Sequence, residues 1–78
     1  MNRQELKKEA MDLMRTVSNS FVRVEDARGI DAIIHTKDKD EFLRAQKAGD
    51  QMGVAKCIMR AQLFKPLYLL SQKQLKKL

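Results

Sequence analysis

The side chains best suited to metal or acid–base chemistry lie around the single histidine of this chain. His35 is followed at close spacing by Asp38, Asp40 and Glu41, and an imidazole with several carboxylates is a donor set that divalent cations accept. The segment lacks the turn glycine and the bidentate glutamate of a calcium-binding EF-hand loop. Acidic residues are also common at the start of a helix, where they interact favourably with the helix dipole. We therefore expect neither a metal site nor a cofactor.

Covalent catalysis would need a nucleophile beside a base, and the sequence offers no such arrangement. Cys57 is the only cysteine and is followed by Ile58 and Met59, with no histidine or acidic residue nearby in the sequence. This setting is typical of a buried, unreactive thiol, and a single cysteine excludes a disulfide within the chain. The sequence also lacks the glycine-rich loop with which proteins bind phosphates. We therefore predict a protein without enzymatic activity.

The net charge of +6 is carried by the last third of the chain, because residues 51–78 hold six basic side chains and no acidic one. These six candidate electrostatic residues are Lys56, Arg60, Lys65, Lys73, Lys76 and Lys77. Such asymmetry predicts contact with a polyanion or an acidic protein surface, although lysines near a helix end also favour the helix dipole. Nucleic acid is the alternative partner. It is disfavoured because this third has one arginine and one polar aromatic, Tyr68, for stacking on bases.

Length and composition are those of one small domain spanning residues 1–78. The hydrophobic fraction of 44% is ordinary for a folded protein. The first ten residues are charged and contain no apolar signal-peptide core. The longest uninterrupted apolar run, Leu67–Leu70, is far shorter than the about 20 residues that span a membrane. We expect no membrane span and a cytoplasmic location.

The spacing of apolar residues predicts a first helix over residues 2–28. Its apolar positions recur at steps of three and four residues, at Leu6, Ala10, Leu13, Val17, Phe21 and Val24. Gly29 suits the left-handed position that ends a helix. We assign residues 29–37 to a connector. Its apolar part, Ile30–Ile34, is not assigned to a strand because no partner strand is evident.

A second helix is predicted over residues 38–65. Asp38 and Glu41 have the spacing of a capping box at its start, and the residue before Pro66 disfavours helical geometry at its end. The remaining residues, 66–78, form a basic, leucine-rich tail. The fold expected from this pattern is all-α: a helical hairpin of two long helices with a short C-terminal element.

Small residues form a stripe along the predicted second helix, and we assign them to helix packing. Ala45, Gly49 and Gly53 are four residues apart and therefore share one helical face, with Met52 at its edge. Small side chains allow a second helix backbone to approach closely. The approaching helix can belong to the same chain, to a second copy or to another protein. Because a two-helix layer leaves one side exposed, we also expect a homodimer or a higher oligomer.

The run DEFLRAQKAGDQM, residues 40–52, follows a charged amphipathic first helix. In this respect the chain resembles short helical-hairpin proteins encoded among the structural and accessory genes of tailed bacteriophages. The resemblance implies a phage-encoded accessory or assembly protein, or an inhibitor of a host protein. Its location would then be the host cytoplasm or the virion.

The sequence therefore predicts a non-enzymatic protein-interaction module. Interface energy is concentrated in buried apolar anchors, while lysines at the rim mainly accelerate association. We assign the anchor role to four residues of the tail, Leu67, Tyr68, Leu70 and Leu75. Lys73, Lys76 and Lys77 would steer the partner electrostatically. The alternative function is nucleic-acid binding through the lysine-rich third.

Overall fold

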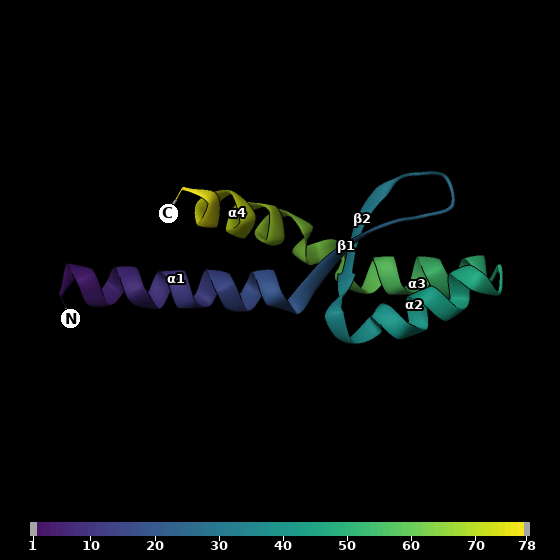
Figure 1. Cartoon of the computed structure of the whole chain (residues 1–78), viewed down its shortest axis with the longest axis horizontal. Helices are drawn as coiled ribbons and strands as arrows, with labels where there is room; N and C mark the ends of the chain where they lie inside the picture. The colour runs from purple at the N-terminus through teal and green to yellow at the C-terminus, as the bar shows by residue number, and fades with distance from the viewer. Residues whose placement is uncertain (1, 78) are drawn as a thin grey trace.

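The structure, a computed structural model, describes residues 2–77. It begins with helix α1, Arg3–Ser20, which runs along the long axis of the molecule (Figure 1). Asn2 caps this helix: its side chain accepts a hydrogen bond of 2.8 Å from the backbone N–H of Glu5, and the Glu5 side chain accepts one from the backbone of Asn2. The reciprocal pair satisfies two N–H groups that have no partner inside the helix.

The chain leaves the helix at Phe21, whose φ of −131° and ψ of 153° are those of a strand. Strand β1, Phe21–Glu25, pairs antiparallel with strand β2, Asp31–His35. The predicted helix over 2–28 is therefore too long, and the predicted connector over 29–37 contains a strand. Valines at alternate positions, Val22 and Val24, favour the extended conformation and supply the partner strand that sequence reasoning did not find.

The second predicted helix, 38–65, is also wrong as one continuous element. After the 3₁₀ turn η1, Thr36–Asp38, the chain forms helix α2, Lys39–Lys47, and then helix α3, Gln51–Ala61. Gly49 separates them with a φ of +71°, a conformation that glycine adopts without steric cost.

Helix α3 receives its own N-terminal cap at this break. The Asp50 side chain accepts a hydrogen bond of 3.0 Å from the Gly53 N–H, which makes Asp50 a capping residue rather than an interior helical one.

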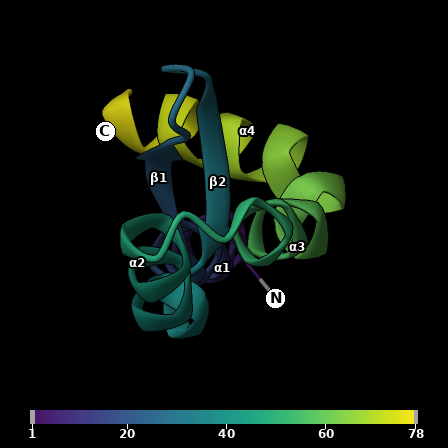
Figure 2. The ribbon, with the colours of Figure 1, turned by 90° about the vertical axis from the view of Figure 1, so that its right-hand side faces the viewer.

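The C-terminal tail is a helix. A 3₁₀ turn, η2, Gln62–Phe64, leads from α3 into α4, Lys65–Lys76, with Pro66 in its first turn, where a missing N–H costs nothing. Helix α4 runs back over α1 (Figures 1 and 2). The Gln72 side-chain amide donates to the Ser18 hydroxyl across this contact.

The β-hairpin is the central layer of the molecule, and small apolar clusters cover both of its faces. On one face Phe21 and Ile33 pack with Ala61 and Tyr68; on the other, Ile34 packs with two buried residues of the helices, Phe42 and Cys57. Figure 2, viewed along the long axis, shows the hairpin at the centre with α2 and α3 on either side of its lower part. Three consecutive buried residues, 32–34, reflect this burial on both faces.

The molecule is elongated, 52 × 20 × 17 Å, and α1 extends beyond the packed body. None of residues 3–20 in α1 is fully buried. The fold is mostly helical, as expected, but the two-stranded sheet corrects the all-α prediction. Within residues 2–77, none of the helices has the length and apolar character needed to span a bilayer.

Candidate protein-interaction surface

Seven large apolar side chains of α3, η2 and α4 are exposed, and five of them have the spacing of one helical face, which we call the exposed stripe. Their exposed fractions are 84% for Met52, 73% for Met59, 89% for Leu63, 48% for Leu67 and 52% for Leu70. Consecutive members are seven, four, four and three residues apart, the spacing of one helical face. Leu63, in η2, connects the part on α3 to the part on α4.

The stripe is exposed because α3 uses a different face for the core. Val54, Cys57, Ile58 and Ala61 have helical spacing and pack against the hairpin or its flanking clusters. The sequence pattern had placed Met52 at the edge of a packing face of one long helix. The break at Gly49 removes that continuity, so α3 is free to turn a different face to the core.

A shallow hollow of about 730 Å³ lies beside the α3 part of the exposed stripe. Met52 and Met59 line it together with parts of α2 and the loop before α3, the full set being Glu41, Asp50, Met52, Gly53, Ala55, Lys56, Met59 and Arg60. Both acidic groups in the hollow already have internal partners: Glu41 pairs with Arg60 at 2.8 Å, and Asp50 caps α3. Lys56 is exposed at its edge.

The six candidate electrostatic residues divide into two groups. Arg60 pairs with Asp38 at 3.2 Å as well as with Glu41, and the hydrogen bond to Glu41 is the main reason that the pKa of Arg60 is raised above its usual value. The Lys65 ammonium donates to the Asp31 carbonyl at 3.3 Å. These two cations therefore fasten α3 and α4 to the rest of the fold. Exposed side chains make up the second group: Lys56, Lys73, Lys76 and Lys77.

The four predicted anchor residues differ in their exposure to water. Leu67 and Leu70 belong to the exposed stripe, whereas Tyr68 is buried, with an exposed fraction of 6%, and its ring meets Phe21 edge-on at 6.2 Å. Leu75 is half-buried. Tyr68 is therefore a core residue and is not accessible to a partner. Sequence reasoning did not single out Met59 and Leu63, although their helical spacing from Met52 could have placed the three on one face.

The predicted small-residue stripe is not one helical face. Gly49 lies in the turn between helices, and Met52 contributes to the exposed stripe instead. Gly53 lies close to α2: a Cβ built on it would be 3.0 Å from the Ala45 Cβ and 2.6 Å from Oδ2 of Asp50. Ala45 and Gly53 thus lie at a close approach of α2 and α3 within the chain.

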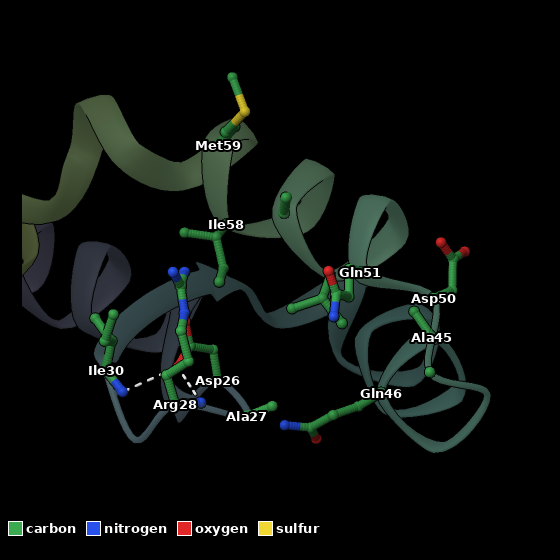
Figure 3. Close-up of a pocket in the computed structure, with 13 residues that line it drawn as sticks. Asp26, Ala27, Arg28, Ile30, Ala45, Gln46, Asp50, Gln51, Ile58 and Met59 are labelled. Atoms are coloured by element: carbon green, nitrogen blue, oxygen red, sulfur yellow. Dashed lines mark hydrogen bonds and ion pairs between the residues drawn. The ribbon is translucent and has the colours of Figure 1, made fainter.

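A second hollow, of about 550 Å³, lies between the hairpin turn and the α2–α3 pair (Figure 3). Its apolar lining includes Ile30 and Ile58. In the turn, Asp26 Oδ1 accepts hydrogen bonds from the N–H groups of Arg28, at 2.8 Å, and Ile30, at 3.0 Å. The bond from Ile30 is the largest cause of the lowered pKa of Asp26. Both carboxylate oxygens of Asp26 therefore have partners inside the turn, since the Arg28 side chain also pairs with Oδ2.

In the part of the chain that the structure describes, no three His, Cys, Asp or Glu side chains are grouped so that they could hold a metal ion. The comparisons with known proteins give no match among family models, curated proteins or solved structures.

Proposed function

We propose that this protein is a non-enzymatic protein-interaction module that docks through the exposed stripe. One observation carries the proposal: the five large apolar side chains of the exposed stripe remain in water although the chain has few residues with which to build a core. Apolar surface in water is unfavourable by about 25 cal/mol per Å². Single exposed leucines are ordinary, but a connected series of them is typical of an interaction site.

The chemistry of the stripe supports a protein partner. Methionine is flexible and polarisable, so Met52 and Met59 can adapt their shape to a partner surface. The exposed lysines at the edges of the stripe, Lys56 and Lys73, would raise the association rate of an acidic partner.

The proposal is tested by affinity capture with three forms of the full chain, namely wild type, Met59→Glu/Leu63→Glu, and Leu43→Glu. Met59 and Leu63 are exposed, so their replacement leaves the fold intact, which circular dichroism verifies. Leu43 is 49% exposed on α2, outside the stripe, and serves as the control. We expect a protein retained by wild type and Leu43→Glu to be lost with the double variant. Identical captured sets with all three forms would refute the proposal.

The resemblance of residues 40–52 to phage-encoded helical hairpins suggests two kinds of partner. We propose that the module is an accessory or assembly protein, or an inhibitor of a host protein. A captured virion protein supports the first role, and a captured host protein supports the second.

We also propose self-association, through α1 rather than through the stripe. Leu6 and Leu13 are 55% and 66% exposed. They are seven residues apart and therefore share one face of the helix. Two copies that bring these faces together would shield both leucines from water.

The alternative function, nucleic-acid binding, is favoured by one observation: Lys73, Lys76 and Lys77 are exposed near the end of α4. Each phosphate contact contributes about 0.9 to the slope of log affinity against log salt concentration. If these lysines bind DNA, replacing all three with alanine lowers that slope by about 3. An unchanged slope excludes them as the phosphate contacts.

A further inference from the structure

We infer that the element covering the exposed stripe is an acidic amphipathic α-helix of another protein. This inference rests on the proposed function, because it identifies the partner that docks on the same surface. It follows from the charge around the stripe, from the secondary structure that carries the stripe, and from its length.

The charge around the stripe calls for an acidic partner. Residues 1–50 hold ten basic and ten acidic side chains, so the whole excess of positive charge lies in the segment that contains the stripe. In the hollow itself the carboxylates of Glu41 and Asp50 balance the charges of Lys56 and Arg60, so the excess positive charge along the stripe comes from the four lysines of residues 65–77. Lys56 and Lys73 are exposed. A second copy docked stripe to stripe would bring two such segments together, which like-charge repulsion disfavours.

The secondary structure of the stripe calls for a helical partner. The stripe lies on α3, η2 and α4, whose backbone N–H and C=O groups are largely bonded within the helical path. An extended peptide would find no strand edge there to satisfy its own backbone, whereas a helix satisfies its backbone internally. The partner therefore contacts the stripe with its side chains and makes no backbone hydrogen bonds to it.

The dimensions of the stripe match those of a short helix. From Met52 to Leu70 is 18 residues of helical path, or about 27 Å at 1.5 Å per residue. A partner helix of similar length can lay leucine or aromatic residues along the stripe, with one of them entering the hollow of about 730 Å³ between the methionines and α2.

The test measures binding of two fluorescent model helices of about 20 residues, long enough to be helical alone. Both carry leucines at the same positions of one face; one has glutamates beside them and the other lysines. Fluorescence anisotropy with the full chain should show the glutamate helix binding at least about tenfold more tightly at low salt, with the preference shrinking as salt rises. Lys56→Glu/Lys73→Glu should reverse the preference. Lys47→Glu, an exposed lysine of α2 outside the stripe, should not.

The Met59→Glu/Leu63→Glu variant separates this inference from the proposed function. If both helices bind equally and the variant abolishes binding, the acidic partner is wrong and the docking surface stands. If the variant leaves binding unchanged, both proposals fail. Two further results overturn the inference: neither helix binds the wild-type chain, or the variant abolishes association between copies of this chain, which would make a second copy the occupant.

Discussion

At the residue scale, the conformation of Gly49 determines where α2 ends. Its φ is +71°, and a Cβ built on it would meet nothing within 4 Å. The cost of a side chain here is therefore purely a backbone cost, about 1–2 kcal/mol for alanine in the left-handed region. We predict that Gly49→Ala lowers the free energy of unfolding by about this amount, and that Gly49→Asn lowers it less because asparagine tolerates the conformation. Urea denaturation measures the free energy of unfolding of both variants. An alanine variant as stable as wild type would contradict the left-handed conformation of Gly49.

The carboxylate of Asp26 makes the hairpin turn sensitive to acid. Its pKa is lowered from 3.8, first by the hydrogen bond from the Ile30 N–H and then by that from Arg28. A lowered folded-state pKa means that the ionised group stabilises the fold above the unfolded value, and that this contribution is lost as pH falls through the folded value.

We predict that wild type is more stable than Asp26→Ala at neutral pH and that the difference shrinks as pH falls below about 3.8. Asp26→Asn is the control: it keeps an acceptor oxygen but does not titrate, so its stability should depend less on pH in this range. Denaturation midpoints across pH give the comparison, and a constant difference between wild type and the alanine variant would show that the carboxylate charge is not involved.

At the element scale, the contact between α2 and α3 explains why position 53 is glycine. Alanine normally stabilises a helix by about 1 kcal/mol over glycine. Here its Cβ would lie 2.6 Å from Oδ2 of Asp50 and 3.0 Å from the Ala45 Cβ. We predict that Gly53→Ala destabilises the protein, because the capping carboxylate and α2 must both move.

A double-mutant cycle separates the two contacts. Asp50→Ala alone should cost about 0.5–2 kcal/mol, the usual value for a lost helix cap. In that background Gly53→Ala should be less harmful, because only the contact with Ala45 remains. Strictly additive effects would mean that Asp50 does not restrict the side chain at position 53.

At the scale of the whole molecule, we predict that copies of this chain associate through α1. Leu6 and Leu13 are exposed on a helix of which none of residues 3–20 is fully buried. The sedimentation coefficient should rise over a hundredfold range of concentration for wild type. Leu6→Glu/Leu13→Glu should remain monomeric, while Met59→Glu/Leu63→Glu should associate like wild type. A wild type that stays monomeric throughout the range excludes self-association and leaves the proposal for the stripe untouched.

The sequence alone was sufficient to predict the mainly helical character, the helical pattern of Leu6 to Val17 and the concentration of positive charge in residues 51–78. These properties depend on local propensity, on helical periodicity and on composition, which neighbouring residues already determine.

Tertiary structure decided the rest. Phe21 and Val24 continue the helical spacing of α1 and also fit a strand, and their pairing with residues 31–35 selects the strand. The same holds for α3, where either of two apolar faces could be buried. Once Gly49 breaks the helix, packing against the hairpin buries Cys57 and Ala61 and leaves Met52 and Met59 in water. Sequence reasoning therefore found Leu67 and Leu70 but not the part of the candidate site on α3, because spacing defines a face and only contacts between distant segments determine which face is exposed.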